Sequence, residues 1–194
     1  MKWFRKQTAP AAAPVQLREA GHHPFGLLGQ YVPMRSGEIR LYRAVREAVP
    51  VVDAAIYKLI RMVGGVTAAC SDPAAERALG EFLRTVPAGR GQYGVNAFLE
   101  GYLDSLLTCG RAIGEIVPAA GNREIAAVLW GRVEDIEIQE GDHPLAFVIC
   151  GPDERGRMGP LPCQDLLLFT PLNPEADSPY GVSLLRGQIG RAHV

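Results

Sequence analysis

The chain has 194 residues, of which 47% are hydrophobic and 21% charged, so it can bury a core of the size that one ordinary domain needs. The formal net charge is only −1, but residues 1–61 carry ten Lys/Arg against four Asp/Glu, and the remainder carries −7. Lys58 and Arg61 interrupt the most apolar stretch, so no membrane-spanning helix is expected, and the basic N-terminus lacks a continuous apolar segment, which argues against a secretory signal.

Residues 1–33 are expected to form a flexible basic arm followed by an irregular segment. The first 20 residues mix basic side chains with an Ala/Pro tract, which has too few bulky apolar groups to offset the entropy of ordering. Glycine, proline and histidine then separate a few apolar residues up to Pro33. His22 and His23 are adjacent, which directs their side chains apart, so the pattern favours a surface pair over a metal site.

Four helices are predicted after this arm, over residues 37–48, 50–63, 73–86 and 95–109. In the first, Arg40, Arg43 and Arg46 share one side, which favours a solvated face over a surface for DNA or a partner. A short strand, VTAAC, is expected before Asp72, which has the features of an N-cap because Pro73 fits the first helical turn. The fourth helix has the clearest apolar stripe, formed by Val95, Phe98, Leu99, Tyr102, Leu103, Leu106 and Leu107 and stopped by Gly110.

The sequence beyond Gly110 changes to short apolar segments separated by Gly, Pro and Asn turns. RAIGEIV, REIAAVLW, RVEDIEI, PLAFVIC and QDLLLFT are typical of strands, and together they predict an antiparallel meander. Val133, Ile136 and Ile138 alternate with acids, which indicates one face toward the core and one toward water. Helices followed by strands indicate the α+β class, with four N-terminal helices packed on a small antiparallel β-meander.

One segment matches a nucleotide-binding pattern. Gly89, Gly91 and Gly94 in GRGQYG fit G-x-G-x-x-G before a helix, and Glu115 follows near the expected distance. The pattern requires a buried strand before the glycines, whereas GEFLRTV continues the preceding helical stripe. A flexible loop between two helices is therefore favoured over a dinucleotide site, and a phosphate-binding G-x-x-x-x-G-K-[ST] loop and a nucleophile elbow are both absent from the sequence.

The four cysteines give no sign of a metal or redox site. Cys70, Cys109, Cys150 and Cys163 form no C-x-x-C pair, and no histidine lies at ligand spacing. Four buried free thiols are the expected arrangement. The sequence thus assigns no catalytic, cofactor-binding or metal-ligating residue, and no cofactor.

The order of the segments over residues 50–187 resembles the N-terminal part of tailed-bacteriophage portal proteins. AIYKLIRMVGG, ALGEFLRTV, GVNAFLEGYLDSLLTCGRAIGEIV and DLLLFTPLNPEADSPYGVSLLRG follow one another as in that family. Gly110 to Glu115 nearly match the family's G-x-x-x-E strand, and Tyr180 to Ser183 resemble its Y-G-x-S turn before another helix, expected here from Val182. The resemblance implies a portal wing-like domain over residues 34–187.

This resemblance implies a virion component at the portal vertex of the capsid, assembled in the host bacterial cytoplasm. The expected homo-oligomer is a ring, typically dodecameric, that docks the terminase large subunit, capsid or scaffold proteins and head–tail adaptors. Double-stranded DNA would pass through the ring non-specifically, and we expect neither enzymatic activity nor a membrane. Two alternatives stay open at this point: a nucleotide-binding enzyme using Gly89 to Gly94, and a cytoplasmic adaptor.

The C-terminus has an unusual feature. Ile189 to Val194 can be encoded by ATC GGA AGA GCA CAC GTC, which reproduces a common sequencing-library adapter, so residues 188–194 are interpreted as an artefactual tail on a truncated chain. Because the stem and clip regions of the family would follow further along the chain, the fragment is expected to expose apolar patches and to aggregate.

Overall fold

The computed structural model of the chain describes residues 36–121, 124–142, 146–153, 155–175 and 178–189. The predicted basic arm with its irregular segment, the histidine pair and the last five residues lie outside this part. Among the described residues, no helix combines the length and the apolar character that crossing a bilayer requires.

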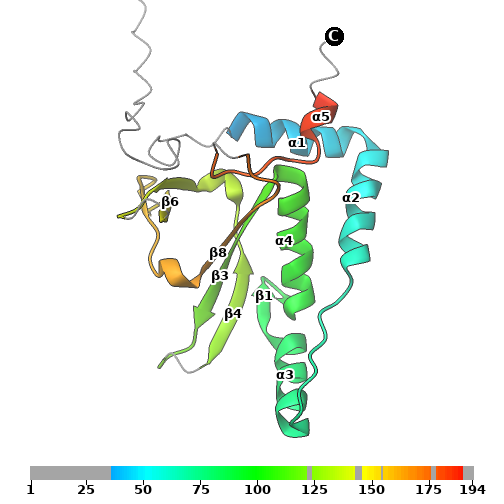
Figure 1. The fold of residues 1–194 in the computed structure, drawn as a ribbon, viewed down its shortest axis with the longest axis vertical. Coiled ribbons are helices and arrows are strands. Elements are labelled where there is room, and N and C mark those ends of the chain that lie inside the picture. The colour runs from blue at the N-terminus through cyan, green and yellow to red at the C-terminus, as the bar shows by residue number, and fades with distance from the viewer. Residues whose placement is uncertain (1–35, 122–123, 143–145, 154, 176–177, 190–194) are drawn as a thin grey trace, which may run out of the picture.

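Four helices precede most of the strands, as the sequence predicts (Figure 1). They are α1 (Ser36–Ala48), α2 (Pro50–Val63), α3 (Pro73–Thr85) and α4 (Val95–Cys109). A short helix, α5 (Arg186–Ile189), ends the described chain. It begins later than the predicted Val182, because Val182 to Leu184 donate or accept hydrogen bonds with other segments before the chain turns into a helix.

The caps of these helices follow from local chemistry. The Asp72 side chain accepts a hydrogen bond from the Ala74 amide at 2.9 Å, and Pro73 occupies the first turn of α3. Gly64 and Gly110 end α2 and α4 with φ angles of 72° and 76°, which favour glycine over residues with a Cβ. The predicted start and stop signals of these three helices are therefore confirmed.

The strands are all antiparallel and form a hairpin and two three-stranded sheets. The hairpin pairs β1 (Pro87–Gly89) with β2 (Gln92–Tyr93). The first sheet has the order β4 (Ile125–Trp130), β3 (Arg111–Pro118), β8 (Leu167–Pro171). The second has the order β5 (Glu137–Glu140), β6 (Phe147–Pro152), β7 (Met158–Pro160), with the 3₁₀ turns η1 (Val133–Asp135) and η2 (Gln164–Leu166) linking the two sheets.

Two apolar clusters hold these layers together. Phe98 and Tyr102 of α4 pack on Ala112 of β3 and Val128 of β4, which joins the helices to the first sheet. On the other side, Ile113 packs in a second cluster with Ile39 of α1, Cys109, Val133, Ile136 and Ile149. The first sheet is thus covered by α4 on one face and by the second sheet on the other, and Figure 1 shows it between these layers.

The α+β class with four helices and small antiparallel sheets is confirmed, but three details of the sequence prediction are wrong. The strand segments divide into two sheets, because the chain turns away at Gly131 and η1, and β8 returns to pair with β3. VTAAC is not a strand, since residues 66–70 lie in an exposed connection without a neighbouring strand. The predicted flexible loop at residues 87–93 is instead the β1–β2 hairpin.

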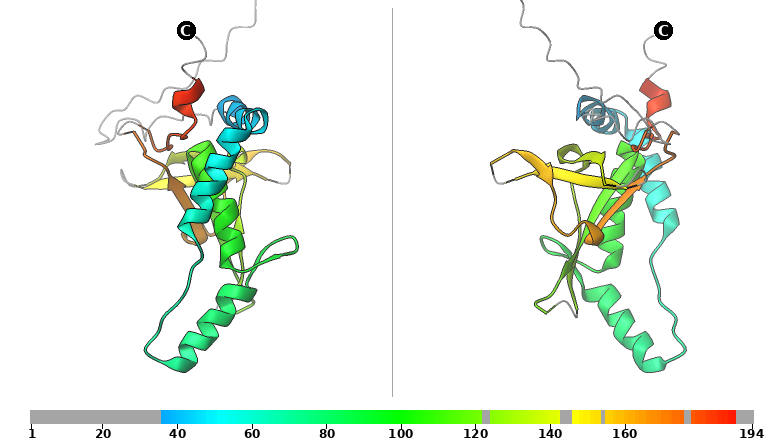
Figure 2. Two further views of the ribbon diagram at one scale, coloured as in Figure 1. Left: turned by 90° about the vertical axis from the view of Figure 1, so that its right-hand side faces the viewer. Right: turned by 60° about the vertical axis from the view of Figure 1, so that its left-hand side comes forward.

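Helix α3 and the connection before it stand apart from the layered body. Figure 2 shows α3 at one end of the molecule, with its N-terminal half projecting beyond the sheets. None of its residues is buried, and the connection from Gly64 to Asp72 is exposed almost throughout. We refer to residues 64–85 as the projecting segment.

Candidate functional site

The two glycine motifs that carry the family resemblance meet in space. Gly110, at the end of α4, lies against residues 181–183, and a Cβ on Gly110 would overlap the Ser183 amide nitrogen. A Cβ on Gly181 would overlap the Gly110 carbonyl oxygen and the Leu172 backbone. Both positions therefore require glycine because three backbone segments approach without room for a side chain. We call this contact the glycine junction.

Hydrogen bonds connect the segments of the glycine junction. The Leu172 amide donates to the Gly110 carbonyl at 2.8 Å, and the Val182 amide donates to the Leu172 carbonyl at 2.7 Å. The Ser183 hydroxyl donates to the Thr108 carbonyl at 2.6 Å and accepts from the Leu185 amide at 3.0 Å. The serine of the Y-G-x-S motif thus caps the end of α4 and fixes the last turn of the chain to it.

A buried cation–π pair lies beside the glycine junction. The Arg111 guanidinium stands 4.8 Å from the centre of the Tyr180 ring, and Arg111 is only 7% exposed. Burial lowers the pKa of Arg111 and raises the pKa of Tyr180, whose hydroxyl accepts a hydrogen bond from the Ile138 amide at 3.1 Å. The Arg111 Nε finds no hydrogen-bond partner in the described part of the chain. The contact with the aromatic ring is therefore the main interaction that offsets the cost of burying the guanidinium.

The structure therefore assigns packing roles to the motif residues. Gly110 and Arg111 contact Tyr180 to Ser183 across about 70 residues of sequence, a proximity that sequence order alone did not predict. Glu115, the acidic residue of G-x-x-x-E, is exposed on β3 opposite Leu129 and Leu167 and lies outside the glycine junction. The signal that could have indicated the contact is the pair of motifs itself, each with a glycine next to a polar residue.

A second polar cluster joins three helices near the same, C-terminal end of α4. The Arg46 guanidinium of α1 donates to Asp53 of α2 at 2.9 Å, to Asp104 of α4 and to the Thr108 hydroxyl at 2.8 Å. Its plane also lies over the Tyr57 ring at 5.3 Å. Although burial by itself lowers the pKa of Arg46, the hydrogen bonds to Asp104 and Asp53 outweigh it, and the net pKa is raised. We call this group the arginine cluster.

The arginine cluster corrects the prediction of a solvated arginine face on α1. The Arg46 side chain is only 10% exposed, and Arg43 forms an ion pair with Glu134 of η1 at 2.7 Å. Of the three, Arg40 is classed as exposed, as predicted. Two of the three arginines therefore attach α1 to other elements of the same chain instead of presenting a surface to DNA. Sequence analysis missed this role, although Asp104 and Thr108 are conspicuous polar positions on an apolar helix.

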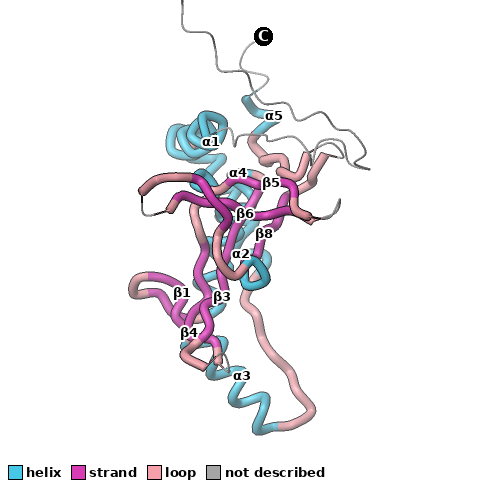
Figure 3. Tube along the Cα trace, turned by 90° about the vertical axis from the view of Figure 1, so that its left-hand side faces the viewer, coloured by secondary structure: helices cyan, strands magenta, loops and turns pink. Residues whose placement is uncertain are grey.

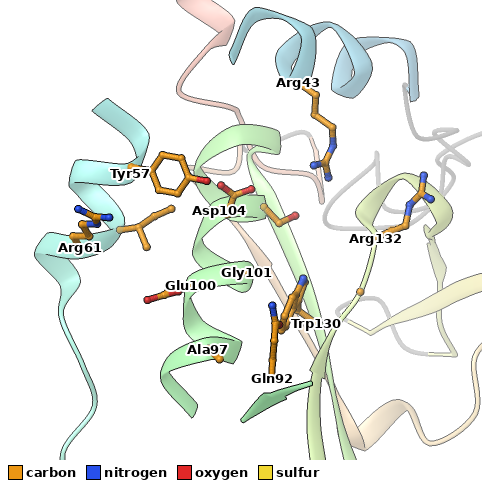
Figure 4. A pocket seen from close by; sticks show the side chains of 13 residues that line it. Arg43, Tyr57, Arg61, Gln92, Ala97, Glu100, Gly101, Asp104, Trp130 and Arg132 are labelled. Carbon is orange, nitrogen blue, oxygen red and sulfur yellow. The ribbon is translucent and has the colours of Figure 1, made fainter. Parts of the chain in front are cut away.

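A cavity of about 660 Å³ opens next to the arginine cluster, between α2, α4 and β4 (Figure 4). Its walls carry both signs of charge, with Arg61 and Arg132 facing Glu100 and Asp104. Trp130 closes one side, and its indole lies so close to Gly101 that a Cβ there would overlap the ring. Arg43 adds a third positive charge to the lining, and Gln92 of GRGQYG also reaches the cavity.

The G-x-G-x-x-G segment does not have the geometry of a dinucleotide site. It follows helix α3, and its glycines build the β1–β2 hairpin, with Gly91 at φ 70° in the turn and Gly94 at φ 87° before α4. A Cβ on Gly94 would approach the Leu83 and Arg84 carbonyls, so protein backbone occupies the space next to it. The parallel strand that the nucleotide interpretation requires is missing from the described sheets.

The cysteines are only partly as predicted. Cys109 and Cys150 are buried, and burial raises the pKa of both thiols. Cys70 and Cys163 are exposed, which contradicts the expectation of four buried thiols, because both lie in connections that the layers do not cover. No group of three or more potential metal ligands occurs within the described ranges.

Comparisons with known proteins show where this fold occurs. No family model and no curated protein sequence matches the chain. Among solved structures, a chain in the neck of the native GTA particle, computed with C12 symmetry, is similar over 84% of this chain and 42% of its own length, at 17% identity and a TM-score of 0.64. A chain in the neck of the empty GTA particle, computed with C6 symmetry, is similar over 84% of this chain and 43% of its own length, at 20% identity and a TM-score of 0.64.

A chain in the virion of the native gene transfer agent (GTA) particle is also similar, over 86% of this chain and 44% of that chain, at 18% identity and a TM-score of 0.64. This chain therefore spans less than half the length of the particle proteins that it resembles. At these identities the likeness shows the fold alone, and the described α+β arrangement is similar to part of these GTA particle chains.

Proposed function

We propose that the chain is part of a structural subunit of a phage-like particle, located at the neck where head and tail join, and specifically of the portal protein. The observation that carries this proposal is the likeness of at least 84% of the chain to chains in two GTA neck structures. The order of motifs around Gly110 and Tyr180, which resembles portal proteins, supports the same assignment from the sequence.

The placement of the polar residues supports a scaffold that performs no chemistry. The Arg46 guanidinium donates hydrogen bonds to Asp53, Asp104 and Thr108, and the buried Arg111 packs on the Tyr180 ring. Both groups connect elements of the same chain, so their charges are used in packing. We therefore propose a non-enzymatic role in which these contacts make the wing rigid enough to hold its place in an assembly.

In this proposal the complete subunit forms a closed homo-oligomeric ring at one capsid vertex. The ring contacts capsid or scaffold proteins, docks the terminase large subunit during packaging and later docks head–tail adaptors. Viral DNA passes through its centre during packaging and ejection without sequence-specific contacts. The C12 and C6 symmetries of the GTA neck structures are those of a ring and support this part of the proposal by analogy.

Electron microscopy of protein expressed from the whole reading frame that encodes this chain tests the proposal. We expect closed rings with a central channel in class averages and a matching discrete mass by native mass spectrometry. A protein that stays monomeric at all concentrations would contradict the proposal. Saturable binding of a dinucleotide that is lost in Gly91→Val would instead favour the enzyme alternative, and monomers without such binding would favour a cytoplasmic adaptor.

A further inference from the structure

Helix α2 carries apolar side chains that the described part of the chain does not cover. Ile56 and Ile60 are its buried residues. Val51 and Met62 lie on a different side of the helix and are 73% and 72% exposed. The spacing of Val51, Ala55, Leu59 and Met62 places them on one stripe of the helix, about a third of a turn from the buried stripe. We call these four residues the α2 stripe.

Basic side chains border the α2 stripe. Lys58 and Arg61 are exposed on α2, and neither forms an ion pair within the described part of the chain. Asp53, the acidic residue of α2, is paired with Arg46, so the exposed charges of this helix are the positive ones of Lys58 and Arg61. An apolar stripe with a basic border is suited to a partner surface that combines exposed apolar side chains with acidic ones.

The second sheet has these complementary properties and lies on the opposite flank. Residues 131–165, which contain β5, β6 and β7, carry three Lys/Arg against eight Asp/Glu, a net charge of −5. The apolar side chains of Phe147 and Met158 are exposed there. Figure 3 shows this sheet toward the viewer with α2 behind it, and Figure 1 shows the two on opposite sides of α4 and β3.

We propose that the α2 stripe of one copy docks on the β5–β6–β7 sheet of a second copy of this chain. Two different, complementary patches on opposite flanks are what a head-to-tail contact needs, and such contacts close into a ring when the rotation fits. A symmetric contact of α2 with α2 would instead bring Lys58 and Arg61 close to their own copies. The inference rests on the proposed ring-forming function and names the surface through which the ring would form.

Charge reversal on α2 tests the contact. We expect Lys58→Glu/Arg61→Glu to weaken self-association at least tenfold by sedimentation velocity, because the new acids would face the acidic sheet. Adding Asp142→Lys to that variant should restore part of the loss. Arg77→Glu, on the exposed face of α3, is the matched control and should associate like the wild type. Circular dichroism melts of all variants should agree, since the substituted side chains are exposed.

Cross-linking identifies the two surfaces directly. Met62 is replaced by a photoreactive amino acid. The ¹⁵N-labelled and unlabelled forms of this protein are then mixed and irradiated. We expect cross-linked peptides that join position 62 of one isotopic form to residues 131–165 of the other. Cross-links between two α2 segments, or to a different surface, would overturn the inference.

The outcomes separate this inference from the proposed function. Rings that persist in the charge-reversed variant, or that form without cross-links to residues 131–165, would refute the docking surface while leaving the ring-forming function in place. A wild-type protein without rings in any condition would refute both.

Discussion

Helices α3 and α4 are of similar length, yet they differ in how many of their residues are buried. Helix α4 buries five residues, and both apolar clusters of the molecule reach it through Phe98 and Cys109. Helix α3 buries none, although Leu79, Phe82 and Leu83 give it a clear apolar face. An apolar stripe therefore predicts a face that favours contact, but it does not predict whether the same chain supplies the covering surface.

The difference in burial has a structural origin. Helix α4 is followed directly by β3, and Gly110 lets the chain reverse so that the strand lies back along the helix. Helix α3 is reached through an extended connection and is held mainly near its C-terminal end, where Val86 enters the core. The two regions should consequently differ in how much each side chain contributes to the free energy of unfolding.

Truncation of an apolar side chain in each helix gives the largest expected contrast. We expect Phe98→Ala to lower the free energy of unfolding by about 3–5 kcal/mol, because its ring is 5% exposed and packs on Gly114. Leu79→Ala, at a residue 42% exposed, should cost less than about 1 kcal/mol. Urea unfolding followed by circular dichroism measures both, and equal costs would remove the distinction between the two regions.

The two helix-ending glycines sharpen the comparison, because both have a positive φ angle but only one is enclosed. Gly110 and Gly64 have φ angles of 76° and 72° with ψ angles of 5° and −161°, and only Gly110 has backbone atoms where a Cβ would lie. We expect Gly110→Ala to cost about 3 kcal/mol, because backbone strain and overlap add, and Gly64→Ala about 1–2 kcal/mol from backbone strain alone. Thermal melts provide the readout, and a Gly64→Ala cost that matches Gly110→Ala would show that packing at the glycine junction is unimportant.

The arginine cluster lies within the layered body, where it joins α1 and α2 to α4. We expect Arg46→Ala to cost about 2 kcal/mol, because it removes charge-assisted hydrogen bonds to Asp53, Asp104 and Thr108, two of them on partly exposed carboxylates. Hydrogen exchange should accelerate first in the N-terminal turns of α2. Arg40→Ala is the control on the exposed side of α1 and should stay within about 0.5 kcal/mol of the wild type.

The smallest effect concerns alkaline stability at the glycine junction. Burial raises the pKa of Tyr180, so the folded state keeps this phenol protonated at a pH where the unfolded chain ionises it, near 10. Its contribution to stability is therefore complete below pH 10 and is lost as the pH rises further. Tyr180→Phe should reduce the alkaline loss by at most about 1.4 kcal/mol per pH unit. Tyr93→Phe, at an exposed position, is the matched control.

Local features of this fold could be predicted from the sequence, and non-local ones could not. Asp72, Gly64 and Gly110 act through atoms within a few residues, so each helix end follows from its own neighbourhood. The β1–β2 hairpin was also local but was missed, because its strands are only three and two residues long. Its signal was the two-residue connection Arg90–Gly91, in which glycine takes the positive φ angle that such hairpins favour.

The pairing of β8 with β3 and the arginine cluster depend on residues far apart in sequence. The short apolar run in QDLLLFT predicts a strand but does not identify its neighbour, and here the neighbour is β3 instead of β7. Likewise, helical spacing placed Arg46 on one side of α1 but held no information on Asp104, 58 residues away. For the glycine junction, the sequence identified the two motifs but did not predict that they contact each other.

The return of β8 to β3 also affects how the chain can fold while it is being synthesised. Helix α4, β3 and β4 are consecutive and can associate as soon as they leave the ribosome. The edge of β3 that pairs with β8 stays open until residue 171 has emerged, and Gly181 cannot close onto Gly110 before that. During this interval the nascent chain presents an unpaired strand edge, which is a template for association with other chains.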